Sequence, residues 1–221
     1  SREFGWYNRN TGYNPLTIEG KKSVSFEIWA QLGFKAPGRV FVSCGDGVIV
    51  SGVYKGFEEL LMLGLIERMP RIFLIQSSGS DNLVRNLFTG TFHSTPSHTL
   101  ADSISVDVPR NFYMARQFVH KYDGEGICVS DQEILQASSM LASKAGVFTE
   151  PAGAAAYAGY LASANRQNRK TTGDDVVLLT GSGLKDLESV QHIHAMPEAI
   201  EPDRRAMDYL ARLNVNKNTR R

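Results

Sequence analysis

Residues 42–52 read VSCGDGVIVSG, and the turn inside this stretch decides how the surrounding sequence is interpreted. The apolar run Val40–Val42 is typical of a buried strand, and it leads through Gly45-Asp46-Gly47 into sequence compatible with a helix. Backbone N–H groups at such a turn and helix N-terminus favour an anion. However, Val50 stands where G-x-G-x-x-G requires its third glycine, and the Lys-Ser/Thr pair of a P-loop is missing. The turn alone is therefore compatible with a phosphate site and with a plain tight turn.

Short apolar runs alternate with helical patterns along the rest of the chain. The expected strands are Val40–Ser43, Arg71–Ile75, Ile127–Val129 and Val176–Leu179. The expected helices are Lys21–Leu32, Gly52–Glu67, Asn82–Phe88, Asn111–Lys121, a helix from Asp131, Ala152–Ala164 and Asp203–Leu213. Short, uniformly apolar strands that alternate with helices indicate βαβ units and a parallel sheet covered on both faces. We therefore expect an α/β fold, doubly wound, with a mostly parallel sheet between two layers of helices.

Two of these helices carry further local signals. Ser130 and Glu133 fit the S-x-x-E capping box, which predicts that a helix begins at about Asp131. The helix after Pro151 consists almost wholly of Ala, Gly and Tyr, and such small side chains predict close packing in a buried position.

We expect one α/β domain over residues 20–200, preceded by an irregular segment (1–19) and followed by a helix and polar tail (201–221).

Composition narrows the class of protein. The 221 residues carry a formal net charge of +1, and 42% of them are hydrophobic, which is ordinary for a globular domain. Near-neutral charge argues against a nucleic-acid or membrane-surface partner, and no apolar run is long enough to cross a bilayer. Cys44 and Cys128 indicate buried thiols in a reducing, cytoplasmic compartment rather than a disulfide framework. His192 and His194 lack further ligands nearby, so no metal site is expected.

Two stretches far from the glycine turn carry polar groups at places where a ligand would bind. Residues 147–152 set the carboxylate of Glu150 at the entry of the small-residue helix, and residues 179–186 set the hydroxyl of Thr180 at a strand end. In open parallel sheets, ligands bind beyond the carboxyl ends of the strands. A hydroxyl between glycines at that edge can hydrogen-bond a ring nitrogen, so these stretches favour a ligand site over a plain turn.

The glycine turn, FTEPAGAAAYAG (148–159) and TGSGLKD (180–186), in this order, resemble the pyridoxal-phosphate enzymes of the tryptophan-synthase-β fold type, specifically the threonine synthase branch. The resemblance begins at YNPLTIEGKK (13–22) and includes ADSI (101–104) and PRN (109–111). It covers roughly Tyr13 to Val190, most of the chain.

The resemblance implies pyridoxal 5'-phosphate as the cofactor of the 20–200 domain. The residues that would hold its phosphate through backbone amides are Gly45, Asp46, Gly47, Val48 and Ile49. Thr180 would donate to the pyridine nitrogen, Glu150 would lie near the ring edge, and Asn14 near the substrate; Glu150 fits a plain helix N-terminal carboxylate equally well. A neutral hydroxyl at the ring nitrogen favours β- or γ-elimination or replacement on a small amino-acid substrate. The resemblance also implies a homodimer.

The sequence departs from this family at two points. The lysine that forms the Schiff base in these enzymes lies upstream of the matched region; Lys185 follows the nitrogen contact instead, and Lys21 and Lys22 are expected to be solvated. We therefore expect the C-terminal portion of a longer enzyme, inactive alone and without a catalytic lysine, whose partner would be the missing N-terminal portion or a second chain. Thr17 stands where many threonine synthases carry an arginine for the substrate phosphate, which points to another amino acid, for example that of a β-eliminating ammonia-lyase.

Two other functions remain open from the sequence. A non-catalytic α/β binding or regulatory module would keep the phosphate-binding turn without the lysine. A nucleotide-binding domain is disfavoured by the missing third glycine and by Gln76, which closes the next strand where an acidic residue would be expected.

Overall fold

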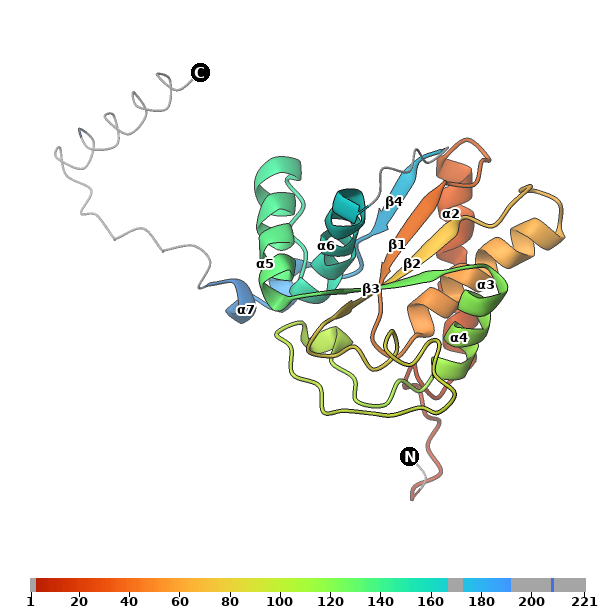
Figure 1. The fold of residues 1–221 in the computed structure, drawn as a ribbon, viewed down its shortest axis with the longest axis horizontal. Coiled ribbons are helices and arrows are strands. Elements are labelled where there is room, and N and C mark those ends of the chain that lie inside the picture. The colour runs from red at the N-terminus through yellow and green to blue at the C-terminus, as the bar shows by residue number, and fades with distance from the viewer. Residues whose placement is uncertain (1–2, 167–172, 192–207, 209–221) are drawn as a thin grey trace. The chain divides into compact units, whose positions relative to one another are not determined.

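The computed structural model describes residues 3–166, 173–191 and 208 (Figure 1). Within them, four parallel strands form one sheet in the order β3-β2-β1-β4. The strands are β1 (Arg39–Ser43), β2 (Arg71–Ser77), β3 (Glu125–Val129) and β4 (Asp175–Leu178). The expected α/β fold with a parallel sheet is confirmed.

Helices follow or precede every strand. The α-helices are α1 (Leu16–Lys21), α2 (Ser23–Gln31), α3 (Val48–Met62), α4 (Phe112–Lys121), α5 (Asp131–Met140), α6 (Pro151–Arg166) and α7 (Glu188–Gln191). Short 3₁₀ turns lie at Asp102–Ile104 and Gly183–Lys185, and one π turn follows α5 at Leu141–Ala145.

The helices cover both faces of the sheet (Figure 1). Successive side chains of a strand point to opposite faces, so Val40 and Val42 pack against α3 and α4, while Phe41 packs against α6. The central strands β1 and β2 are thereby buried on both sides, which explains their continuous apolar sequence. In contrast, β4 lies beside β1 alone among the described strands and is only half-buried, although its sequence predicted a buried strand.

The small-residue helix α6 is buried as expected. Ala154 and Ala155 are fully buried, and Gly159 lies so close to the sheet that a Cβ there would overlap the side chain of Ile75. Small residues on this face allow the helix axis to approach β2 more closely than larger side chains would permit. Because α6 begins at Pro151, this close packing fixes the position of Glu150 immediately before it.

The predicted capping box of α5 is confirmed. Ser130 Oγ accepts from the Glu133 nitrogen at 3.3 Å, and the Ser130 nitrogen donates to Glu133 Oε2 at 2.7 Å. Asp131 holds the loop above the sheet, since its carboxylate accepts from Ser77 Oγ at 2.9 Å and from the Leu100 nitrogen at 3.0 Å. The loop that follows β2 is thus fixed at the carboxyl edge of the sheet.

The helix predicted for Asn82–Phe88 is wrong, because the structure has a series of turns there. The buried Gln76 side chain accepts from the Leu83 and Val84 nitrogens at 3.0 and 2.8 Å. The Asn86 side-chain amide donates to the Asn82 carbonyl at 2.8 Å, which is the acceptor that a helix would use. The backbone keeps one i→i−4 bond, from Arg85 to Asp81, and otherwise makes i→i−3 bonds, so polar side chains stabilise a series of turns here.

Several boundaries also differ from the expected ones. The helix α3 begins at Val48, directly after the glycine turn, and not at Gly52. The helix α1 begins at Leu16, inside the segment expected to be irregular. Apart from Asp208, the predicted helix 203–213 lies outside the described residues, as do His192 and His194. In the described part of the chain, no helix combines the length and the apolar character needed to span a membrane.

Candidate functional site

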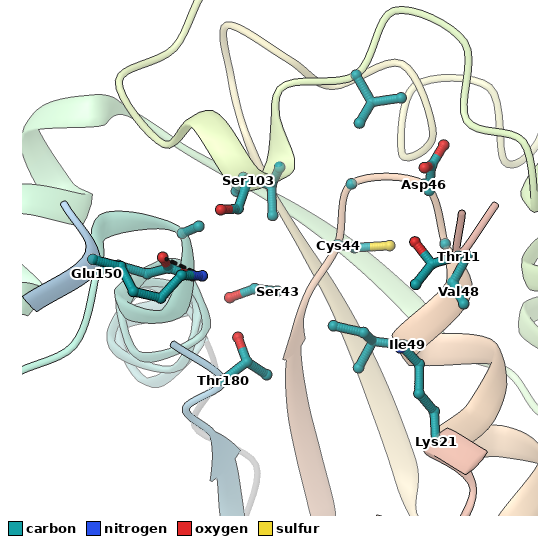
Figure 2. Close-up of a pocket in the computed structure, with 16 residues that line it drawn as sticks. Thr11, Lys21, Ser43, Cys44, Asp46, Val48, Ile49, Ser103, Glu150 and Thr180 are labelled. Carbon is teal, nitrogen blue, oxygen red and sulfur yellow. Dashed lines mark ion pairs between the residues drawn. The ribbon is translucent and has the colours of Figure 1, made fainter. Parts of the chain in front are cut away.

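The glycine turn lies where β1 ends and α3 begins, at the carboxyl edge of the sheet (Figure 2). Gly47 is the N-cap of α3 and has φ +85°, a left-handed conformation that favours glycine. Gly47 has no side chain with which to cap the helix, so the N–H groups of the first turn of α3 are left for another acceptor. These groups and the helix dipole together favour an anion at this end.

Both glycines of the turn also lie close to neighbouring segments. A Cβ on Gly45 would lie 3.0 Å from the Cα of Ile104, and a Cβ on Gly47 would lie 2.9 Å from Leu83 Cδ1. Between them, Asp46 turns toward α4, where its Oδ1 accepts from the Arg110 nitrogen at 3.0 Å. The turn therefore presents mainly backbone to the space above the sheet.

A second wall is formed by two segments that pair with each other. The Glu150 nitrogen donates to the Gly181 carbonyl at 3.0 Å, and the Gly183 nitrogen donates to the Phe148 carbonyl at 3.1 Å. Thr149 Oγ1 adds a hydrogen bond of 2.6 Å to the same Gly181 carbonyl. A Cβ on Gly181 would overlap the side chain of Glu150, so the glycine leaves room for Glu150 in this position. The pairing holds Glu150 beside the segment that carries Thr180.

Glu150 is a buried carboxylate with one cationic partner. The residue is only 6% exposed, and its Oε2 lies 3.2 Å from Lys185 Nζ, whose side chain is 63% exposed. Figure 2 shows this ion pair at the side of the pocket opposite the glycine turn. Lys185 thus supplies the opposite charge that a carboxylate needs when it is removed from water.

The seven residues predicted to hold a cofactor line one cavity of about 290 Å³. They are Gly45, Asp46, Gly47, Val48, Ile49, Glu150 and Thr180. The turn stands on one side of this cavity, and Thr180 stands with Glu150 on the other (Figure 2). The Thr180 hydroxyl makes no hydrogen bond with the described residues, so it is available to a ligand. The structure brings the predicted residues together; their binding roles stay predictions.

Asn14, predicted to lie near the substrate, does not line this cavity. Its side-chain amide donates to the Tyr7 hydroxyl at 2.6 Å, and its side-chain oxygen accepts from the Leu16 nitrogen at 3.0 Å. These bonds fix the start of α1, which is a structural use of the residue. Thr17 is used locally too, because its hydroxyl donates to the Thr11 and Asn14 carbonyls at 2.9 and 2.7 Å.

The two lysines expected to be solvated behave differently from each other. Lys22 forms ion pairs with Glu19 and Glu59, both at 2.9 Å. Lys21 is half-buried, lines the cavity and makes no ion pair among the described residues, so its ammonium group is open to the solvent of the cavity. Lys185 also lines the cavity.

A pair of glycines explains why Lys21 reaches the cavity. A Cβ on Gly52 of α3 would lie 2.7 Å from the Cβ of Lys21, and a Cβ on Gly56 would lie 2.7 Å from the Cβ of Ser25. These glycines, one helical turn apart, let α1 and α2 lie directly against α3. The spacing G-x-x-x-G in the α3 sequence is the signal that would have identified this close approach.

Further residues of the cavity were not singled out from the sequence. They are Thr11, Ser43, Cys44, Ser103, Ile104, Val106 and Ala152. Burial raises the pKa of the Cys44 thiol to about 12, so this cysteine is a neutral wall of the cavity and not a nucleophile. The segment that carries Ser103 and Ile104 closes over Gly45. The ADSI stretch (101–104) signalled this segment, without indicating a role.

The chain is similar to known proteins over most of its length. A family model described as "Pyridoxal-phosphate dependent enzyme" matches residues 1–183. The threonine synthase of Methanocaldococcus jannaschii is 32% identical over 193 residues, which cover 86% of this chain and 48% of that protein. The threonine synthase of Synechocystis sp. is 37% identical over 174 residues, 78% of this chain and 43% of that protein. The chain spans about half the length of the curated relatives it matches.

Solved structures share the fold at lower identity. A threonine deaminase from T.th. superimposes with a TM-score of 0.63 at 24% identity, over 76% of this chain and 59% of that one. An L-serine ammonia-lyase from Rhizomucor miehei gives a TM-score of 0.69 at 19% identity, over 82% of this chain and 58% of that one. At these identities the likeness concerns the fold.

Proposed function

We propose, since the chain belongs to the family of pyridoxal-phosphate dependent enzymes, that it forms the phosphate-binding part of an enzyme that eliminates or replaces a side-chain substituent of an amino acid. One observation carries the proposal. The glycine turn at 45–49, Glu150 and Thr180 are distant in sequence but line the same cavity of about 290 Å³. The turn lies on one side of this cavity, and the carboxylate and the hydroxyl lie on the opposite side (Figure 2).

The donors of this cavity fit pyridoxal phosphate. The cofactor carries a phosphate ester on one side of its ring and a pyridine nitrogen elsewhere on the ring. The uncapped N-terminus of α3 suits the phosphate, and the Thr180 hydroxyl, which has no other described partner, suits the nitrogen. Gly45 lets the backbone of the turn lie directly against the Ser103–Ile104 segment, since a Cβ there would lie 3.0 Å from the Ile104 Cα.

Each group of the chain has a role that follows from its chemistry. The backbone N–H groups of Gly45–Ile49 would hold the phosphate, and Thr180 would donate to the ring nitrogen without being able to protonate it. Glu150, held by Gly181 and Lys185, positions the edge of the ring. When bound, pyridoxal phosphate supplies the electron sink for bond cleavage at the amino acid. A ring whose nitrogen stays unprotonated withdraws electrons less strongly. It therefore favours elimination or replacement over reactions that need a long-lived carbanion.

We further propose that the substrate lacks the phosphate that threonine synthases recognise. Thr17 supplies no charge, and its hydroxyl is used by the Thr11 and Asn14 carbonyls. The absence of that charge makes a β-hydroxy amino acid, as used by a β-eliminating ammonia-lyase, the first candidate. Steady-state assays of the complete enzyme with threonine, serine and O-phosphohomoserine discriminate a β-hydroxy amino acid from a phosphorylated substrate. A preference for O-phosphohomoserine would contradict the proposed β-hydroxy amino acid.

We also propose that the lysine that attaches the cofactor is not contributed by this chain. Lys185 is bound to Glu150 at 3.2 Å, and Lys21 approaches from the side of the phosphate-binding turn. The test is to mix the purified chain with pyridoxal 5'-phosphate, reduce with borohydride and map the modified peptides. We expect phosphate-dependent binding without a stoichiometric lysine adduct. A stoichiometric adduct on Lys185 would refute the lysine assignment, and absence of any binding would refute the proposed function.

A further inference from the structure

The N-terminus of α4 lies against the glycine turn, and Asn111 stands at this contact. Asn111 is the N-cap residue of α4, a position where asparagine usually accepts a hydrogen bond from its own helix. Here the side chain makes no such bond. Its amide nitrogen donates instead to the Gly47 carbonyl at 3.1 Å and to Ser51 Oγ at 2.6 Å. The Asn111 side chain therefore binds the first turn of α3 and does not cap its own helix.

The backbone reinforces this contact. The Asn111 nitrogen donates to the Asp46 carbonyl at 3.0 Å, and the preceding Arg110 nitrogen donates to Asp46 Oδ1 at 3.0 Å. Four hydrogen bonds thus join residues 110–111 to residues 46–51. Ser51 is fully buried, so water cannot replace the bond that it accepts.

These bonds fix the direction of peptide groups in the turn. In a trans peptide, the C=O and the following N–H point in opposite directions. The Gly47 carbonyl is held along α3 by the Ser51 nitrogen at 3.1 Å and by the Asn111 side chain. The N–H of Val48, which shares this peptide plane, is thereby turned out of the helix end toward the cavity that Val48 lines.

We propose that Asn111 is a positioning residue that orients the N–H groups of the turn for the phosphate. The proposal rests on the proposed function, since it needs the phosphate to lie at this turn. Asn111 itself does not line the cavity, so it acts through Gly47 and Ser51 and not by contact with the ligand. Its loss should affect recognition of the phosphate and leave recognition of the ring unchanged.

The test compares pyridoxal 5'-phosphate with pyridoxal, which has the same ring without the phosphate. Asn111→Leu keeps the size of the side chain and removes the amide. We expect the preference for the phosphorylated ligand to fall about 10-fold, a size typical of lost supporting hydrogen bonds, while pyridoxal affinity is unchanged. Hydrogen exchange of the amides at 47–49 should become faster in the same variant.

A matched control is Asn86→Leu. Asn86 is a buried asparagine whose side-chain amide, like that of Asn111, donates two hydrogen bonds, here to the Asn82 and His93 carbonyls at 2.8 and 2.9 Å. It does not line the cavity, so its loss should lower stability without changing the preference between the two ligands. A purely structural role of Asn111 would give the same result as this control.

Ser51→Ala provides a second variant if Asn111→Leu fails to fold. It removes one of the two acceptors of the Asn111 amide while keeping a small side chain, and should lower the preference by a smaller factor. An unchanged preference in every folded variant of this pair overturns the role of Asn111. If the unaltered chain shows no preference for the phosphorylated ligand, the proposed function itself fails and this inference fails with it.

Discussion

Gly153→Ala should loosen the wall of the cavity that holds Glu150. A Cβ at this position of α6 would overlap Thr149 Oγ1 and would lie 3.3 Å from the Gly181 nitrogen. Thr149 is only 2% exposed, and its hydroxyl donates to the Gly181 carbonyl at 2.6 Å. The side chain therefore has no position to which it can move without losing that hydrogen bond.

Opposing terms set the size of the effect. Overpacking costs about 1–3 kcal/mol, and the displaced hydroxyl loses about 1 kcal/mol of net hydrogen bonding. Replacing a helical glycine by alanine raises the free energy of unfolding by roughly 1 kcal/mol. The expected result is a decrease of about 2 kcal/mol in the free energy of unfolding. Thr149→Ala alone should cost about 1–2 kcal/mol, for the lost hydrogen bond and methyl group.

Urea unfolding of both single variants and the double variant forms the assay. The double variant should be no less stable than Thr149→Ala, because the overlap has been removed, so the two changes should couple by about 2 kcal/mol. Gly20→Ala is the control: Gly20 lies in α1 with no atom near the position of a Cβ, and alanine should stabilise the chain by about 0.5–1 kcal/mol. Additive effects within about 0.5 kcal/mol would refute the packing argument.

Three further predictions concern charged and titratable groups. Lys21→Gln should weaken binding of pyridoxal 5'-phosphate about threefold by removing a cation from the cavity, whereas Lys22→Gln should leave it unchanged; equal effects in a fluorescence titration would contradict the assignment. Because burial raises the pKa of Cys44 to about 12, the folded chain keeps a proton that the unfolded chain releases above pH ~8.5. Stability should therefore fall above that pH, less steeply in Cys44→Ala, as followed by urea midpoints. Asp175→Asn should destabilise by about 2 kcal/mol, since it leaves the largely buried Arg39 of β1 without its anionic partner; a change within about 0.5 kcal/mol would contradict this.

The sequence predicted the parts of the site that depend on strand ends and special residue types. The glycine turn, Glu150 and Thr180 each follow or precede a strongly patterned element, so their place at one edge of a parallel sheet follows from the order of strands and helices. The same reasoning located the start of α5 through Ser130 and Glu133, because a capping box is a purely local signal.

Other parts depend on contacts that no local pattern contains. Lys21 and Lys22 are neighbours with the same chemistry, yet only the packing of α1 against Gly52 decides which of them enters the cavity. The segment 82–88 has a helical pattern but forms turns, and two of its N–H groups donate to Gln76, a residue of a different element. Tertiary hydrogen bonds override local propensity at such positions.

The pairing of β1 with β4 has a consequence for how the cavity comes into being. Arg39 and Asp175 join these neighbouring strands although they are 136 positions apart in the chain. During synthesis the glycine turn leaves the ribosome well before the wall that carries Thr180, so the cavity can form only after both segments are made. Closing so long a loop is entropically costly and slow. A ligand that bridges both walls stabilises the closed arrangement, by about 2.7 kcal/mol at one hundred times its dissociation constant. The cofactor would thus stabilise the pairing of the two walls at a late stage of folding, in addition to its chemical role.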